Sequence, residues 1–251
     1  MGDTNKRQMI FLFDVDGVII ESPHEKSWGG AALNWGLISE DFNFTDFYQK
    51  YVAGLPGLQG AEIILTRTDY YEKAKIKTQK EKQVKAKEFR EAKQKILDEY
   101  ISKGEFKVFE DVLEIIKQAK KQGIPIAAVS SSENAEKMLK KINLLKVFDS
   151  TTLGAIKYRV ANKENLYSFA FGKLCGRIKI DSSALPIIFE DADKCIIAAK
   201  NANYLCVGIA RKGLTTTKAL IEKGADLAYD ESTLKEIGYE GLIKDLIKII
   251  C

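Results

Sequence analysis

The sequence has no apolar run long enough to cross a membrane. Its longest runs, such as residues 185–189, fall far short of the roughly 20 residues that a spanning helix needs. The first eight residues are polar, and the apolar run 9–13 ends at an acidic residue, so we expect no secretory signal peptide. Hydrophobic residues make up 45% of the chain and charged residues 29%, which is typical of a globular protein and excludes wholesale disorder. We therefore expect no membrane partner.

Cysteine and histidine are both scarce. The four cysteines (Cys175, Cys195, Cys206 and Cys251) show no Cys-x-x-Cys spacing, whereas a zinc site or a disulfide framework requires closer pairs. We predict reduced, mostly buried thiols and a cytoplasmic location. His24 is the only histidine.

Excess charge of one sign is nearly absent, since the net charge is only +4. Residues 67–107 hold 13 lysines and arginines against 8 acidic residues, and such a basic stretch can bind nucleic acid. However, Glu72, Glu81, Glu88 and Glu91 are interleaved with the basic residues, and no basic loop with interspersed aromatics accompanies them. We favour a solvated helix and expect no nucleic-acid partner. A non-catalytic binder that uses this stretch remains a remote alternative.

Short apolar runs alternate with helical patterns over most of the chain. The runs span 9–13, 124–129, 186–189 and 204–209, and amphipathic or small apolar helical patterns cover 133–144 and 196–202. This alternation predicts an α/β fold with a parallel sheet covered by helices on both faces. The stretch 21–104 has no convincing strand but carries apolar residues at helical spacing, so we expect a helical insert there.

Acidic pairs follow two of the predicted strands. Asp14 and Asp16 come after the first strand, and Glu190 and Asp191 come after the run 186–189. In open parallel sheets ligands bind beyond the carboxyl ends of the strands, so these groups can address one site. Carboxylates alone would repel a phosphate, so the cluster implies a bound cation. Oxygen ligands of this kind suit Mg²⁺.

Anion-binding groups follow in the same pattern. The run Ser130–Ser132 comes after the strand 124–129 and supplies hydroxyls suited to an anion. A basic residue is expected to complete the site. Lys163 is the candidate for this position, with Lys157 nearby as the alternative.

At these residues the sequence resembles the haloacid dehalogenase superfamily of phosphotransferases. Residues 13–18 (Phe-Asp-Val-Asp-Gly-Val) match its first motif, Val129-Ser130 the second and 188–192 (Ile-Phe-Glu-Asp-Ala) the fourth. Lys163 resembles the third motif, although the usual Lys-Pro-x-Pro reads Lys-Glu-Asn-Leu here. The four motifs occur in order at the predicted strand ends and span nearly the whole chain. The resemblance implies a Rossmann-like core formed by residues 1–20 and 105–251, with a helical cap over 21–104 that selects the substrate.

The resemblance also implies a mechanism. Asp14 is expected to attack phosphorus and form an aspartyl-phosphate, and Asp16 to protonate the leaving oxygen and then activate water. Mg²⁺ is expected to be held by Asp14, the main-chain carbonyl of Asp16 and Asp191, with Glu190 in direct or water-mediated contact.

The phosphoryl oxygens would be held by Ser130, Ser131 and Lys163. In the cap, His24 and Trp28 reproduce a spacing found in the branch similar to β-phosphoglucomutase. His24 is a candidate for positioning Asp16 or contacting substrate, and a solvent-facing histidine is the alternative. Lys26 is a second candidate for substrate contact.

We thus expect a Mg²⁺-dependent phosphohydrolase that cleaves a small phosphorylated metabolite, acting as a monomer or weak dimer. A sugar phosphomutase of the β-phosphoglucomutase type is the alternative. Those mutases carry an arginine after the small-residue turn of the cap, whereas residues 54–59 read Gly-Leu-Pro-Gly-Leu-Gln. They also carry a lysine shortly after the second motif, where this chain has Glu133. Lys26, Lys50 or Arg67 could supply the missing charge.

Overall fold

The structure is a computed structural model that describes residues 8–53, 55–160, 162–181 and 183–250. The first seven residues, Gly54 of the predicted cap turn and Cys251 lie outside this range. Within it, no helix is both long and apolar enough to span a membrane. The chain divides into two compact units. We call Ser22–Phe106 the helical unit, and the described residues up to Glu21 together with those from Lys107 onward the core unit.

The core unit is built on a six-stranded parallel sheet in the order β5-β4-β1-β6-β7-β8. The strands are β1 (Met9–Asp14), β4 (Ile126–Ser130), β5 (Ser150–Leu153), β6 (Leu185–Glu190), β7 (Leu205–Ala210) and β8 (Leu227–Asp230). The four central strands coincide with the four apolar runs of the sequence, because strands covered on both faces are apolar throughout. The predicted α/β class and the helical region inserted between β1 and β4 are confirmed.

The two outermost strands were not predicted from the sequence. Strand β5 reads Ser-Thr-Thr-Leu and β8 reads Leu-Ala-Tyr-Asp, so neither forms an apolar run. Both lie at the edges of the sheet, where each pairs with only one neighbour. Strand β8 is only partly buried, whereas β5 is largely buried but polar, so neither shows the continuous apolar run by which the central strands were predicted.

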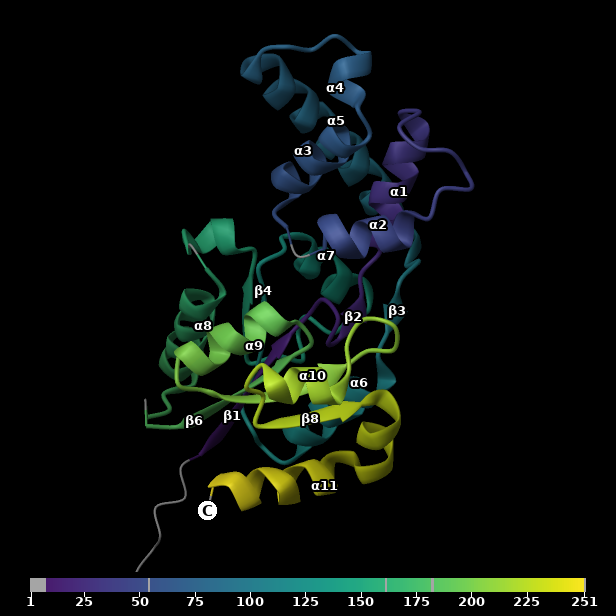
Figure 1. Ribbon diagram of the computed structural model, residues 1–251. Helices are drawn as coiled ribbons and strands as arrows, with labels where there is room; N and C mark the ends of the chain where they lie inside the picture. Colours follow the sequence, from purple (N-terminus) through teal and green to yellow (C-terminus); the bar gives the residue numbers. More distant parts are fainter. Residues whose placement is uncertain (1–7, 54, 161, 182, 251) are drawn as a thin grey trace, which may run out of the picture. The chain divides into compact units, whose positions relative to one another are not determined.

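Helices cover both faces of the sheet (Figure 1). They are α6 (Glu110–Lys121), α7 (Asn134–Lys141), the short 3-10 helix η1 (Ala155–Tyr158), α8 (Lys163–Ile178), α9 (Asp193–Asn201), α10 (Thr217–Glu222) and α11 (Glu231–Ile250). Side chains alternate along β1, so Ile10 and Leu12 join the apolar cluster that contains α8, α9 and α10. Phe11 and Phe13 lie on the opposite face, where both rings contact Phe189 of β6. Two short antiparallel strands, β2 (Ile20–Glu21) and β3 (Lys107–Val108), pair where the chain leaves and re-enters the core unit.

The helical unit consists of α1 (His24–Asn34), α2 (Phe44–Tyr51), α3 (Gly57–Arg67), α4 (Tyr70–Lys73) and α5 (Gln79–Lys103). Its core is aromatic: the Phe89 ring contacts both Trp28 and Trp35. Helix α5 begins with a capping box formed by Thr78 and Glu81 and ends at Gly104, which adopts the left-handed conformation. Most lysines of the basic stretch 67–107 are exposed, some on α5 and others on the segments that flank it.

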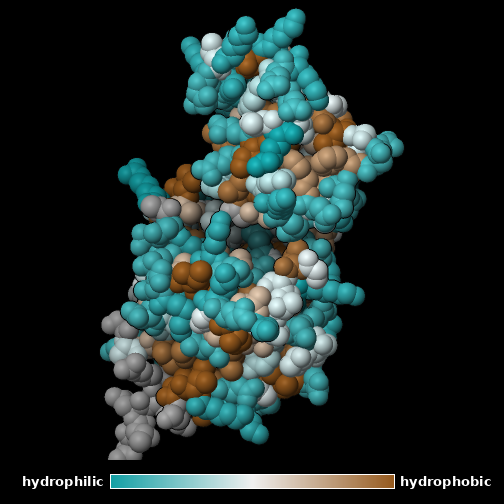
Figure 2. Space-filling view, in the orientation of Figure 1, coloured by the Kyte–Doolittle hydropathy of each residue, from teal (hydrophilic) through white to brown (hydrophobic). Residues whose placement is uncertain are grey.

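The surface drawn in Figure 2 is mostly hydrophilic, with apolar residues scattered among polar ones. The exposed large apolar side chains include Ile156 of η1, Leu214 in the segment between β7 and α10, and Ile221 of α10. Isolated apolar side chains of this kind are normal on globular proteins.

Candidate active site

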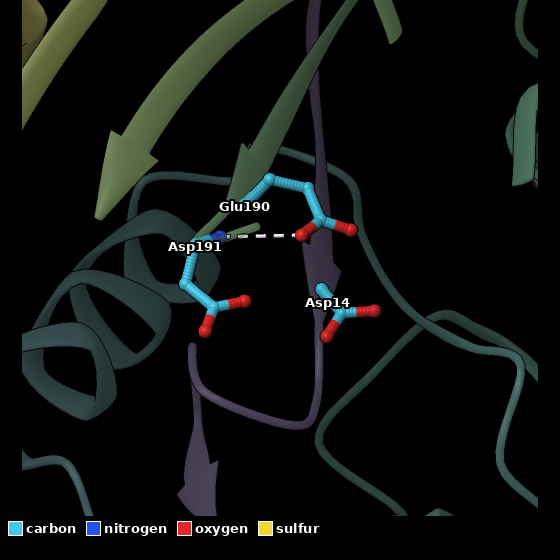
Figure 3. Close-up of side chains that lie close together, drawn as sticks. All are labelled: Asp14, Glu190 and Asp191. Atoms are coloured by element: carbon cyan, nitrogen blue, oxygen red, sulfur yellow. Dashed lines mark hydrogen bonds between the residues drawn. The ribbon is translucent and has the colours of Figure 1, made fainter. Parts of the chain in front are cut away.

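Three carboxylates converge beyond the carboxyl ends of two central strands (Figure 3). Asp14 ends β1, Glu190 ends β6, and Asp191 follows Glu190 directly. One oxygen from each lies within 4.8 Å of the others. Asp14 and Glu190 are buried, and the second oxygen of Glu190 accepts a hydrogen bond from the backbone N–H of Asp191 at 3.2 Å. The pairing of β1 with β6 creates this group from residues 176 positions apart along the chain (14 and 190).

The cluster concentrates negative charge in a buried place. Burial, followed by the charge of Glu190, raises the pKa of Asp191 from its ordinary value to about 8. A divalent cation bound between the carboxylates would relieve this repulsion. All donors in the group are oxygens, which is the preference of Mg²⁺, so the residues present fit the expected metal.

A single lysine partly balances the carboxylates. Lys163, the first residue of α8, pairs with Asp14, and its Nζ lies 3.0 Å from Oε1 of Glu190. Burial opposes its positive charge, but the carboxylates of Asp14 and Glu190 raise the pKa of Lys163 well above its ordinary value. Lys157, the alternative from the sequence, instead pairs with Glu136 on α7 at 2.9 Å. Lys163 is therefore the lysine that reaches the acidic cluster.

Asp16, in the turn after β1, lies beside Ser130, at the end of β4. The Ser130 hydroxyl, at the end of β4, donates to Oδ2 of Asp16 at 3.1 Å and accepts from the backbone N–H of Ser132 at 3.0 Å. Ser130 is buried, whereas Ser131 is exposed. The structure thus brings the serine of the second motif to the second aspartate of the first motif.

The turn after Asp16 passes very close to Asp191. Gly17 has a φ of +83°, and a Cβ added there would lie 1.9 Å from Oδ2 of Asp191. Glycine is required at this position for two reasons: its backbone conformation is disfavoured for other residues, and no space exists for a side chain.

The sequence did not reveal two residues at this site. Tyr167, one helical turn after Lys163 on α8, is buried and donates its hydroxyl to Oε1 of Glu190. Burial, followed by the charge of Glu190, raises the pKa of Tyr167 well above its ordinary value, which keeps the hydroxyl protonated. The i, i+4 spacing from Lys163 was the available signal, since it places both side chains on one helix face. The other missed residue is Arg211, which follows β7 and donates to the carbonyl of Gly17 at 2.8 Å.

The two substrate-contact candidates of the sequence lie in the helical unit. Nδ1 of His24, the first residue of α1, lies 2.9 Å from Nζ of the buried Lys93 on α5. Lys26 is exposed. Trp28 is buried in the aromatic core of the unit.

Comparison with known proteins identifies the family. Residues 9–203 match the haloacid dehalogenase-like hydrolase family. The chain belongs to the haloacid dehalogenase superfamily. The resemblance that its four motifs indicated is therefore confirmed, and the chain is of the phosphatase or phosphomutase type within this family.

Solved structures agree with this assignment. An archaeal β-phosphoglucomutase from Pyrococcus sp. strain ST 04 is 31% identical, with a TM-score of 0.76 and coverage of 95% of this chain and 99% of that one. A hydrolase of the same superfamily from Deinococcus radiodurans shares the fold at 17% identity, with a TM-score of 0.67 and coverage of 96% and 97%. CbbY from Rhodobacter sphaeroides, crystallised with xylulose-(1,5)bisphosphate, shares it at 17% identity, with a TM-score of 0.62 and coverage of 92% and 96%.

Proposed function

We propose that this protein is a Mg²⁺-dependent phosphohydrolase that cleaves a small-molecule phosphate monoester through an aspartyl-phosphate. The observation that carries the proposal is the buried group of Asp14, Glu190 and Asp191, with Lys163 against it, at the carboxyl ends of β1 and β6. A carboxylate nucleophile repels an anionic phosphate. A bound cation and Lys163 would compensate the negative charge of the carboxylate and of the phosphate, so that the two can meet.

The residues divide the chemistry between them. Asp14 attacks the phosphorus, and Asp16 protonates the leaving oxygen and later takes a proton from the attacking water. The Ser130 hydroxyl donates its single proton to the Asp16 carboxylate at 3.1 Å, and it would turn that proton toward a phosphoryl oxygen once Asp16 is itself protonated. Mg²⁺ would be held by Asp14, Asp191 and the carbonyl of Asp16, with Glu190 beside it. When bound, it shields the carboxylates from the phosphate and offsets charge in the transition state.

Lys163, Ser130 and Ser131 would hold the transferring phosphoryl group. The helical unit, which we propose to be a cap spanning about residues 21–104, would select the substrate, with His24 and Lys26 as candidate contacts. The core, formed by 1–20 and 105–251, would carry all of the catalytic groups. The substrate class is a small phosphorylated metabolite.

A phosphomutase is the second candidate, because the Pyrococcus protein at 31% identity is a β-phosphoglucomutase. Transfer between two positions of a sugar needs a cation for the distal phosphate. Residues 54–59 contain no arginine, and Glu133 stands where the mutases carry a lysine. Of the alternatives, the Arg67 guanidinium packs on the Tyr51 ring, 3.7 Å from its centroid. These features favour transfer to water.

The test is turnover of p-nitrophenyl phosphate by the purified chain, with Mg²⁺ and after treatment with EDTA. We expect EDTA to abolish turnover and Mg²⁺ to restore it. Asp14→Asn keeps the side-chain volume but removes the nucleophile, so turnover should fall by on the order of 10³-fold or more while the circular dichroism spectrum stays unchanged.

Asp193→Asn is the matched control, because Asp193 lies two residues after Asp191 at the start of α9, where it faces Lys223 at 3.6 Å. This variant should retain activity. Full activity after metal removal, or near-wild-type turnover by Asp14→Asn, would contradict the proposed function.

A further inference from the structure

Arg211 is a buried arginine outside the group of catalytic residues proposed above. It follows β7, and its side chain is only 4% exposed. Nε donates to the carbonyl of Gly17 at 2.8 Å, and one terminal nitrogen donates to the carbonyl of Val18 at 2.7 Å. The other terminal nitrogen pairs with Asp111 on α6 at 2.7 Å, and the guanidinium stacks on the Phe109 ring at 3.6 Å from its centroid.

These contacts hold the guanidinium in one orientation. The Asp111 carboxylate neutralises its charge, and the Phe109 ring fixes its plane. A guanidinium is a planar group whose N–H donors have a fixed geometry, so immobilising it also fixes the atoms that accept from it. A buried ion pair seldom adds much to stability over an apolar pair of the same size. The specific result of this arrangement is the placement of two consecutive carbonyls.

Those carbonyls belong to the turn that carries Asp16. Asp16 directly precedes Gly17, and the backbone N–H of Gly17 donates to the carbonyl of Ile20 at 2.8 Å, which closes the turn. The same turn is in close contact with Asp191, which leaves no space for a Cβ at Gly17. The turn after Asp16 is thus contacted by both Asp191 and Arg211.

We propose that Arg211 is a positioning residue that sets the turn 16–18, and through it the Asp16 carboxyl, for proton transfer to the leaving group. The inference rests on the proposed function, because it assigns Asp16 the role of general acid. Asp111 and Phe109 act with Arg211 by fixing its guanidinium.

This role predicts a dependence on the leaving group that a purely structural role does not. General acid catalysis matters most when the departing oxygen is strongly basic, and little when the leaving group is stable as an anion. Phenyl phosphate and p-nitrophenyl phosphate have nearly the same shape but differ in this property. Phenolate is the more basic leaving group of the two. A misplaced Asp16 should therefore slow the hydrolysis of phenyl phosphate more than that of p-nitrophenyl phosphate.

The experiment compares kcat/KM for these two substrates in the wild type, Arg211→Met and Arg211→Lys. For Arg211→Met we expect a loss with phenyl phosphate that is at least about tenfold larger than the loss with p-nitrophenyl phosphate. Arg211→Lys keeps the charge but cannot donate to both carbonyls in the same geometry, so it should show the same trend to a smaller degree. If Arg211→Met does not fold, Arg211→Lys serves as the test variant. Arg177 is exposed on α8, so Arg177→Met is the control and should leave kcat/KM for both substrates unchanged.

If the folded Arg211 variants lose the same factor in kcat/KM for both substrates, or lose none, Arg211 does not position Asp16. The proposed function would still stand, provided that the wild type is active. If the wild type hydrolyses neither substrate with Mg²⁺, the proposed function itself is wrong, and the inference fails with it. Thermal unfolding followed by circular dichroism establishes which variants are folded.

Discussion

At the scale of single residues, the orientation of Glu190 depends on its neighbours. Oε1 accepts from the Tyr167 hydroxyl and lies 3.0 Å from Nζ of Lys163, while Oε2 accepts from the backbone N–H of Asp191. The carboxylate is therefore fixed on both oxygens. Groups that orient metal ligands in this way commonly contribute to metal affinity without touching the metal.

Tyr167→Phe removes only the hydroxyl and should leave the fold intact. We expect Mg²⁺ affinity to fall by about 10-fold or more, because Glu190 loses the donor that orients it beside Asp14 and Asp191. Isothermal titration calorimetry of Mg²⁺ binding measures this without any substrate. Tyr204→Phe is the control, since its hydroxyl only reaches Ser168 at 3.5 Å. Unchanged Mg²⁺ affinity in Tyr167→Phe would show that the hydroxyl has no such role.

At the scale of elements, the turn after β1 and the packing of α8 determine the geometry of the site. The turn places Asp16 beside Ser130 and passes against Asp191, and α8 places Lys163 and Tyr167 on one face toward Glu190. Each element brings groups to the site from a different part of the chain. Small displacements of the turn should therefore affect catalysis strongly.

Gly17→Ala tests the turn. The new Cβ would meet Asp191 at 1.9 Å, so either the turn or the Asp191 carboxylate must move. We expect kcat/KM to fall by on the order of 10²-fold. Gly213→Ala is matched to it, because Gly213 has a similar φ of +79° but nothing within 4 Å of the added Cβ. That control should lose about 1–2 kcal/mol of stability from the left-handed backbone and keep its activity. If Gly17→Ala were as active as Gly213→Ala, the contact between Gly17 and Asp191 would not matter for catalysis.

At the scale of the whole molecule, the question is where the phosphoryl group goes. The fold is shared by a β-phosphoglucomutase at 31% identity and, at lower identity, by a hydrolase. The catalytic motifs are common to both activities, so the choice depends on whether a second phosphate can be held. A phosphate dianion in a closed site is costly unless a cation pairs with it.

We predict that hydrolysis outweighs phosphoryl transfer between sugar positions. The segment 54–59 has no arginine, and the acidic Glu133 would repel a distal phosphate. The measurement supplies β-glucose 1-phosphate with a trace of the 1,6-bisphosphate and follows free phosphate and glucose 6-phosphate together. Rapid formation of glucose 6-phosphate with little free phosphate would instead establish the mutase.

Much of the fold and of the candidate site could be predicted because the signals are local. Fully buried central strands are apolar runs, and the residues that follow parallel strands meet at one edge of the sheet. The sequence alone therefore predicts that the strand ends at Asp14, Ser130 and Glu190 belong to one site. The edge strands β5 and β8 lacked this signal, since their half-polar sequences do not differ from loops.

Only the tertiary structure decided which groups complete the site. The sequence favoured Lys163 and left Lys157 as the alternative, and only the packing of α8 shows that Lys163 pairs with Asp14 while Lys157 pairs with Glu136. Arg211 meets the carbonyl of Gly17 across 194 positions of the chain, a contact that no periodicity encodes. Apolar periodicity over a few neighbouring residues predicts strands and their burial. A hydrogen bond between distant segments, in contrast, forms only once the folded sheet has brought those segments together.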